Sequence, residues 1–488
     1  MSPGDLLAVA VVCLYAAGAV WLTALGLHAA LLTVLRAVCP PRSLPAADVE
    51  SWPTVVVQLP VYNEPAALVA RALDAALALD ARGLVQIQLL DDSSPAAQRT
   101  NAALCAERAG RRYPIRHLPR AQRRGFKAGA LADGLRQTDA PLAAVFDVDF
   151  RPPADLLHRL VPPLLADDQL AFVQGRWTHP EAPDTWLARA QEAVLDVHFV
   201  IDQQGRDRAG LPVLFNGSGG VWRVAAIDDA GGWTADTLAE DLDLTVRAWA
   251  KGWRARFDAD AEVPADLPAT VSAWRRQQAR WVKGLAEVGV LHLGRLWRSG
   301  LAVRHKAAFT AHLALAWSLP ASLVVVVLHP LVTLAASTGA VPGNALAVLG
   351  VGYAALIGII TAHVVALRAI HPESWKARLV RIPAALVFPV GLLVPGIRSV
   401  VEAVRRHATP FVRTPKGGAS GGEAGRAEVA LAVYSVVGAL AVIWVGAWGS
   451  AVFQSLVALA TVGAAIAVRR RTHVPRTVPS DAPAQVAA

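Results

Sequence analysis

A charge-free apolar segment near the N-terminus restricts the fold of this chain more than any other feature. No charged side chain occurs from Leu6 to Leu35, a run that is too long for the core of a signal peptide and long enough to cross a bilayer. Hydrophobic residues make up 54% of the sequence, which is high for a soluble protein of this size. Further predicted spans lie at residues 307–335, 345–368, 428–446 and 450–468. The chain is therefore predicted to be an integral membrane protein.

Basic residues predict how the chain is oriented in the membrane. Arg36 and Arg42 follow the first span, whereas the tail before it carries only Asp5 as a charged side chain. The positive-inside rule then places the chain after this span in the cytoplasm. Other arginines crowd beside the apolar segments, where they indicate cytoplasmic flanks rather than a nucleic-acid-binding surface. We expect a bacterial inner-membrane protein with a cytoplasmic catalytic domain and no nucleic-acid partner.

The region between the first span and the later ones has the composition of a globular domain. Strands are predicted at 55–60 and 85–90, and helices at 64–80 and 95–110. This alternation is typical of a doubly wound, mostly parallel sheet. Such a sheet collects functional side chains at the carboxyl ends of its strands. The polar pairs that follow the first two strands are Asn63-Glu64 and Asp91-Asp92.

Two carboxylates one residue apart, Asp147 and Asp149, follow the predicted strand 142–146. Acids spaced in this way suit a hard, partly hydrated divalent cation that bridges to a diphosphate. Taken alone, the pair is a weak signal, since a polar loop at a strand end has the same sequence. The cysteines, Cys13, Cys39 and Cys105, form no C-x-x-C pair and support neither a zinc site nor a disulfide framework.

Two further stretches suit close contact with a ligand. Lys127 follows Arg123 and Arg124 at a predicted helix start, where basic side chains and free backbone donors favour phosphate, although an arginine-rich cap has the same appearance. Residues 216–220 contain three glycines directly after a predicted strand at 213–215. Glycines in that position allow the backbone to approach a ligand.

Later motifs supply a candidate base and a polar helix face. Asp241 follows Glu240 at a predicted helix start and is the better base candidate, because Asp243 is explained as a first-turn acid that complements the helix dipole. Gln277, Arg280 and Trp281 have the spacing i, i+3 and i+4, which puts an amide, a guanidinium and an indole on one face of a helix.

The C-terminal part contains one segment that does not resemble an ordinary span. Residues 382–401 are apolar, have basic flanks and are interrupted by Pro383, Pro389 and Pro395, which favours an interfacial or re-entrant segment that begins and ends in the cytoplasm. The predicted domains are 1–40, an N-terminal transmembrane helix; 50–295, a cytoplasmic domain; 306–370, two transmembrane helices; 380–425, the interfacial segment and a loop; 428–470, two transmembrane helices; and 471–488, a disordered tail.

Six motifs, in this order along residues 54–290, resemble those of processive glycosyltransferases of family 2. The likeness is to the plant cellulose synthase-like A and C proteins, which make β-1,4-mannan or glucan backbones, and to bacterial cellulose synthase. The motifs are Leu90-Asp91-Asp92-Ser93, Lys127-Ala128-Gly129-Ala130-Leu131, Asp147-Val148-Asp149, Phe215-Asn216-Gly217, Glu240-Asp241 and Gln277-Gln278-Ala279-Arg280-Trp281.

The resemblance implies a fold and a set of roles. The fold would be an α/β GT-A nucleotide-sugar-binding domain with a mixed, mostly parallel sheet, inserted between an N-terminal transmembrane helix and a C-terminal transmembrane helical bundle. Asp147 and Asp149 would hold Mg²⁺ or Mn²⁺, and Asp241, beside Glu240, would be the general base. The implied donor-binding residues are Asn63, Glu64, Asp91, Asp92, Lys127, Asp147, Asp149, Gln277 and Arg280. The implied acceptor-binding residues are Phe215, Asn216, Gly217 and Trp281.

Two departures from the family pattern accompany these matches. Phe411, Thr414 and Lys416 resemble the gating loop of cellulose synthases, but Arg413 stands where valine is usual. Ala239 stands where cellulose synthases have threonine before the Glu-Asp pair.

Three functions compete on the sequence alone. The first is an inverting hexosyltransferase that adds a hexose from UDP-glucose or GDP-mannose to a growing β-linked polysaccharide and exports the chain, with or without accessory export subunits. The second is an enzyme that glycosylates a lipid acceptor once, since ceramide glucosyltransferases share the D-x-D and QxxRW patterns. The third is a transporter or scaffold, which the scarcity of charges inside the spans and the full set of acids disfavour.

Overall fold

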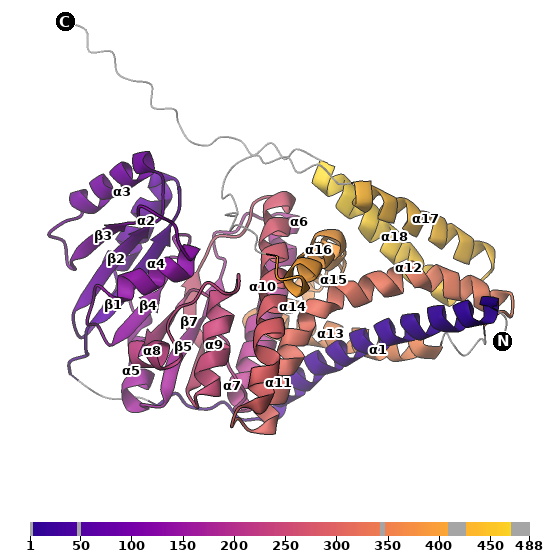
Figure 1. Cartoon of the computed structure of the whole chain (residues 1–488), viewed down its shortest axis with the longest axis horizontal. Coiled ribbons are helices and arrows are strands. Elements are labelled where there is room, and N and C mark those ends of the chain that lie inside the picture. Colours follow the sequence, from indigo (N-terminus) through magenta and orange to yellow (C-terminus); the bar gives the residue numbers. More distant parts are fainter. Residues whose placement is uncertain (1–2, 46–49, 342–346, 408–425, 470–488) are drawn as a thin grey trace, which may run out of the picture.

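The computed structural model describes residues 3–45, 50–341, 347–407 and 426–469. Figure 1 shows an α/β domain at one end of the molecule and long helices that extend from its other side. Helix α1 (Pro3–Val38) runs among these long helices, and the chain then enters the α/β domain. The predicted insertion of an α/β domain between apolar helices is confirmed.

One mixed sheet of seven strands organises the α/β domain, with the order β3-β2-β1-β4-β6-β5-β7. Strands β1, β2 and β4 consist almost wholly of buried side chains, as expected for strands covered on both faces. Only β6 is antiparallel to its neighbours, β4 and β5. The strands are β1 (Val55–Val61), β2 (Val85–Asp91), β3 (Ile115–Pro119), β4 (Leu142–Val145), β5 (Leu170–Thr178), β6 (Gly220–Arg223) and β7 (Arg254–Pro264).

Helices cover the sheet and place the functional motifs. Helix α10 begins after Thr270, whose hydroxyl oxygen accepts a hydrogen bond from the Ala273 N–H and so caps the helix. The helices of this domain are α2 (Ala66–Leu77), α3 (Pro95–Glu107), α4 (Phe126–Leu135), α5 (Leu156–Ala166), α6 (Trp186–Val197), η1 (His198–Gln203), α7 (Gln204–Arg208), α8 (Val224–Asp229), α9 (Glu240–Ala250) and α10 (Val271–Arg298).

The prediction of a strand at 213–215 is wrong. Its backbone donors bond to side chains instead of to a neighbouring strand: Leu214 N–H donates to Gln203 Oε1 at 3.0 Å and Phe215 N–H to Thr245 Oγ1 at 3.3 Å. The strand in this region, β6, starts at Gly220, so the glycines precede a strand rather than follow one. The stretch is a loop that buried polar side chains hold in place.

Five segments among the described residues are long and apolar enough to cross a membrane. They are Ala8–Val38, Val303–Ser337, Arg381–Val404, Arg426–Trp444 and Trp448–Ile466. The helices that contain these segments lie beside one another in Figure 1, together with α13, in which the shorter apolar stretch Leu356–Ile370 lies. Helix α1 packs against both α12 and α13. Their bounds are α11 (Val303–Ala314), η2 (Leu315–Trp317), α12 (Ser318–Ser337), α13 (Ala347–Ile370), α17 (Arg426–Trp444) and α18 (Trp448–Arg469).

The proline-containing segment is broken into short helices. It comprises α15 (Arg381–Val387), the 3₁₀ turn η4 (Phe388–Leu392) and α16 (Leu393–Val404), and it follows α14 (Trp375–Arg378). Proline lacks a backbone donor, so the prolines within the segment account for the break. Helix α16 packs against α10 of the α/β domain and against α12 of the bundle. An interfacial or re-entrant position for this segment remains a prediction, since its length also allows a crossing.

Candidate active site

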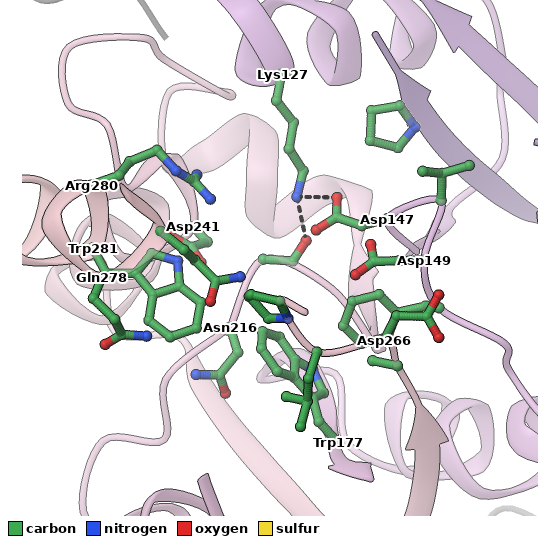
Figure 2. Close-up of a pocket in the computed structure, with 18 of the residues that line it drawn as sticks. Lys127, Asp147, Asp149, Trp177, Asn216, Asp241, Asp266, Gln278, Arg280 and Trp281 are labelled. Atoms are coloured by element: carbon green, nitrogen blue, oxygen red, sulfur yellow. Dashed lines mark hydrogen bonds and ion pairs between the residues drawn. The ribbon is translucent and has the colours of Figure 1, made fainter. Parts of the chain in front are cut away.

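One pocket of about 270 Å³ lies at the carboxyl ends of β1, β2 and β4 and is closed on one side by α10. Figure 2 shows Asp147 and Asp149 on one side of this pocket and Asp241, Arg280 and Trp281 on the other. Most of the site residues predicted from the sequence meet here. Those that line the pocket are Glu64, Asp92, Lys127, Asp147, Asp149, Asn216, Gly217, Glu240, Asp241, Gln277, Arg280 and Trp281.

The two acids after β4 have the donor chemistry for a metal ion. Val148 between them is buried, and both carboxyl groups border the pocket. The Asp147 N–H donates to Ser218 Oγ at 3.0 Å, which fixes the turn. Among the described residues no group of three or more His, Cys, Asp or Glu side chains is placed to hold a metal. Two carboxylates leave coordination positions open for water and diphosphate oxygens, which is how Mg²⁺ or Mn²⁺ would bind here.

Lys127 lies between the acids on the two sides of the pocket. Its Nζ is 2.7 Å from Asp147 Oδ1 and 3.6 Å from Glu240 Oε1, and it donates to the Gly217 carbonyl at 2.8 Å. Burial lowers the pKa of Lys127, but the carboxylates of Asp147, Glu240 and Asp241 outweigh burial and raise it above its usual value. The ammonium therefore stays charged and available to an anionic ligand.

Asp241 is half-buried at the start of α9 and faces the same pocket. Burial raises the pKa of its carboxyl group to about 7, and the neighbouring Glu240 adds to the effect, while Lys127 opposes it. A carboxylate with a pKa near neutrality can accept a proton from a hydroxyl group. Asp243, by contrast, is 2.7 Å from His292 and accepts a hydrogen bond from Arg247, so the structure confirms that it is structural.

Gly217 makes room for Asp241. Its φ is +79°, and a Cβ at this position would lie 2.9 Å from Asp241 Oδ2. A side chain would therefore be strained by the backbone and would also collide with the carboxyl group. The sequence indicated that the backbone approaches a ligand closely at Gly217. In the structure, Gly217 leaves room for the candidate base Asp241, which itself borders the pocket.

Asp91 and Asn63, both predicted to bind the donor, are not among the residues that line the pocket. The Asp91 carboxylate is fully buried, where it accepts hydrogen bonds from Ser93 N–H and Asn101 and lies 2.8 Å from His117. Asn63 has φ 49° and accepts from the Ser94 N–H, so it joins the loops after β1 and β2. We reassign both to holding these loops in place.

Phe215 is also corrected, from acceptor binding to the core. It is 2% exposed and packs edge-on against Phe172 and Trp222, away from the pocket. Asn216 does line the pocket, but its side chain is held by Gln203 Nε2 at 2.6 Å and by His198 Nε2 at 2.8 Å. Its backbone N–H also donates to Gln174 Oε1 at 3.0 Å, so both the backbone and the side chain of Asn216 are fixed next to the pocket.

The helix face predicted on α10 is confirmed, since Gln277, Arg280 and Trp281 all border the pocket. The indole of Trp281 is 36% exposed, which leaves a flat aromatic surface open to a ligand. The predicted loop residues Phe411, Thr414 and Lys416 lie outside the described residues.

Several pocket residues were missed from the sequence. Tyr62 directly precedes the predicted pair Asn63-Glu64 and could have been found from this position. Its ring lies 3.5 Å from the Arg123 guanidinium. Asp266, paired with Arg151 at 2.7 Å, carries no sequence signal. Pro389 and Leu392 come from η4, far along the chain, and form the part of the pocket wall nearest the apolar helices. The other missed residues include Trp177, His179, Gln191, Trp274 and Gln278.

Comparisons with known proteins agree with this geometry. A model of glycosyl transferase family 2 matches residues 56–225, and a model of glycosyl transferase family group 2 matches residues 144–361, so that the two together extend over more than half of the chain. The matched region contains all of the sheet except Val55, and all of α10.

Curated relatives are similar over about half of this chain. The probable glucomannan 4-beta-mannosyltransferase 11 of Oryza sativa subsp. japonica is 40% identical over 243 residues, which are 49% of this chain and 42% of that protein. Glucomannan 4-beta-mannosyltransferase 7 of Arabidopsis thaliana is 38% identical over 254 residues, which are 51% of this chain and 46% of that protein. The chain thus matches less than half the length of these relatives.

A solved structure shows the same fold. The mannosyltransferase PcManGT from Pyrobaculum calidifontis, in complex with GDP-Man and Mn2+, superposes with a TM-score of 0.54 at 20% identity over 81% of this chain and 100% of that chain. The predicted GT-A fold is thereby confirmed. With motifs, pocket and sheet in agreement, the chain belongs to the family 2 glycosyltransferases.

Proposed function

We propose that this protein is an inverting hexosyltransferase that transfers a hexose from a nucleotide sugar to a growing β-linked polysaccharide. The observation that carries the proposal is the opposition of Asp241, whose pKa is raised, to the acidic pair Asp147 and Asp149 across one pocket. A leaving diphosphate and an attacking hydroxyl group need such opposite positions, because a single displacement proceeds in line. An α-linked donor then gives a β-linked product.

Each side of the pocket has a separate task in this reaction. Asp147 and Asp149 would hold a divalent cation, which supplies charge stabilisation to the diphosphate. Lys127 and Arg280 add positive charge where the leaving group gains negative charge. Asp241 removes the proton of the acceptor hydroxyl group, and the ring of Trp281 offers a surface on which a sugar can stack.

The relatives favour mannose as the transferred hexose. Those relatives are mannosyltransferases, and the solved neighbour is one in complex with GDP-Man. GDP-mannose is therefore the first donor to test, ahead of UDP-glucose. The same proposal places the α/β domain in the cytoplasm and the apolar helices in a bacterial inner membrane. It also includes export of the polysaccharide chain, with possible accessory export subunits.

Incubation of membranes with each labelled donor, followed by digestion with linkage-specific glycanases and sizing of the products, tests the function. A ladder of long β-linked oligosaccharides supports a processive synthase. A monoglycosylated lipid as the only product would replace it with single transfer to a lipid, which the apolar wall at Pro389 and Leu392 would also accommodate. Absence of transfer from every nucleotide sugar would refute the enzyme assignment.

The transfer rate should rise with pH through neutrality. The base must be ionised to act, and a pKa of about 7 for Asp241 means that its ionised fraction grows from about one tenth at pH 6 to about nine tenths at pH 8. We therefore expect a roughly tenfold increase in kcat over this range, measured under donor saturation. A flat profile from pH 6 to pH 8 would argue against Asp241 as the titrating group.

Gly217→Ala should reduce transfer by about tenfold or more, because the added methyl group meets Asp241 Oδ2 and the positive φ disfavours alanine. Gly110→Ala is the matched control: its φ is +78°, but nothing lies within 4 Å of a Cβ at that position. The measurement is kcat for both variants beside thermal stability. Equal activities of the two variants would show that the contact with Asp241 is unimportant.

A further inference from the structure

A buried lysine on α10 connects helix α16 to the α/β domain. The Lys283 side chain is 3% exposed. Its Nζ lies 3.2 Å from Glu402 Oε2 and donates to the His407 carbonyl at 2.8 Å, both at the C-terminal end of α16. The same Nζ lies 3.8 Å from Glu287 Oε1, one turn further along α10. A single ammonium group thus joins a carboxylate of each helix.

The second carboxylate continues this connection to the loop that carries the candidate base. Glu287 Oε2 accepts a hydrogen bond from the Leu238 N–H at 2.7 Å. Leu238 lines the pocket and precedes Glu240 by two residues. The helix and the loop are also in direct contact, since a Cβ at Gly284 would lie 2.7 Å from the Ala239 Cβ. Any shift of α10 at Lys283 therefore reaches the backbone just before Asp241.

Lys283 also affects the charge of Glu287. Burial raises the pKa of Glu287, and the Leu238 N–H and the Lys283 ammonium oppose this effect. Without the ammonium, the partly buried Glu287 carboxylate would face Glu402 with only the Leu238 N–H to compensate its charge. Loss of Lys283 is thus expected to weaken the acceptor that holds the Leu238 N–H.

We propose that Lys283 is a positioning residue that couples α16 to the loop bearing Glu240 and Asp241, through Glu287 and the Leu238 N–H. The proposal rests on the proposed function for its catalytic consequence. This connection restrains the position of the base Asp241. The donor is contacted by other residues. Disturbing the connection should therefore lower kcat with little change in the KM for the donor.

The same helix offers a matched control. Arg275 pairs with Glu428 of α17 at 2.5 Å, so it also joins α10 to an apolar helix. Arg275 is not among the pocket residues, and its partner Glu428 belongs to α17 rather than to the Leu238 loop. Arg275→Met and Lys283→Met remove comparable ion pairs eight positions apart, but only the second touches the connection to Leu238.

The experiment compares the full-length wild type with Lys283→Met, Glu287→Met, the double variant and Arg275→Met. We expect about a tenfold loss of kcat in the first three variants, a donor KM within about twofold of the wild type, and no further loss in the double variant, because both changes break one connection. Arg275→Met should keep wild-type kcat. Lys283→Arg, which keeps the charge, should recover most of the activity.

Hydrogen exchange provides a readout that does not depend on turnover. The amide of Leu238 should exchange faster in Lys283→Met and Glu287→Met than in the wild type, and should be unchanged in Arg275→Met. Equal exchange in all variants, or additive losses of kcat, would overturn the coupling. If the wild type transfers no sugar, the proposed function fails, yet the exchange comparison still decides whether Lys283 holds the loop. If Lys283→Met does not fold, the kcat and exchange assays are run on Lys283→Arg and Glu287→Gln instead. Lys283→Arg should stay close to the wild type, whereas Glu287→Gln should show a lower kcat and faster exchange at Leu238.

Discussion

Asp241→Asn should lower the transfer rate by about 10²–10⁴-fold, the range expected for loss of a general base. The amide has the shape of the carboxyl group and fits beside Gly217, so the pocket should keep its form. It cannot accept the proton of the acceptor hydroxyl group at neutral pH. We therefore expect kcat to fall while the affinity for the donor stays close to that of the wild type.

Single-turnover transfer and donor binding by calorimetry check this result together. Asp236→Asn is the matched control, because it makes the same change at an exposed position five residues earlier in the chain. The control should behave as the wild type. Near-normal turnover in Asp241→Asn would remove Asp241 from the mechanism and direct attention to Glu240, the other acid at the start of α9.

Asp149→Ala should abolish metal-dependent donor binding. Among the described residues, no third acidic or imidazole side chain is placed to replace Asp149 as a metal ligand. A single carboxylate binds weakly to a cation that must also coordinate a diphosphate. Asp147 would then be left with Lys127 as its nearest cationic partner, at 2.7 Å. The heat of nucleoside diphosphate binding in the presence of Mn²⁺ should disappear.

Calorimetry with and without Mn²⁺ isolates the part of the affinity that depends on metal. Asp168→Ala serves as the control, since its side chain is 90% exposed and lies in the same domain. Unchanged affinity of Asp149→Ala for the nucleotide in the presence of Mn²⁺ would mean that the acidic pair is a surface turn with no role in metal binding.

Much of the site was predictable because strand ends and helix faces are local features. The strand before Asp147 is an apolar run, and the i, i+3, i+4 spacing of Gln277, Arg280 and Trp281 fixes a shared face without knowledge of the rest of the fold. These local patterns were sufficient to bring most of the predicted residues into one pocket.

The errors occurred where a side chain's direction depends on distant partners. Asp91 and Asp92 are adjacent, and only the packing of His117 and Asn101 shows that the first is turned inward and the second borders the pocket. The strand predicted at 213–215 failed because Gln203 and Thr245 bind its backbone donors. No pattern within that segment encodes these partners.

The apolar wall formed by Pro389 and Leu392 also has a consequence for how this family of proteins diversifies. Both residues lie beyond residue 361, where the family match ends, whereas Asp147 and Asp149, the proposed metal ligands, lie within the matched region. The two sides of the pocket are thus encoded by separate stretches of the gene. Under the proposed function, exchange of η4 (Phe388–Leu392) between relatives would alter this apolar wall while keeping Glu402 and the acids at the strand ends, so the acceptor could change without a change in the donor-binding side.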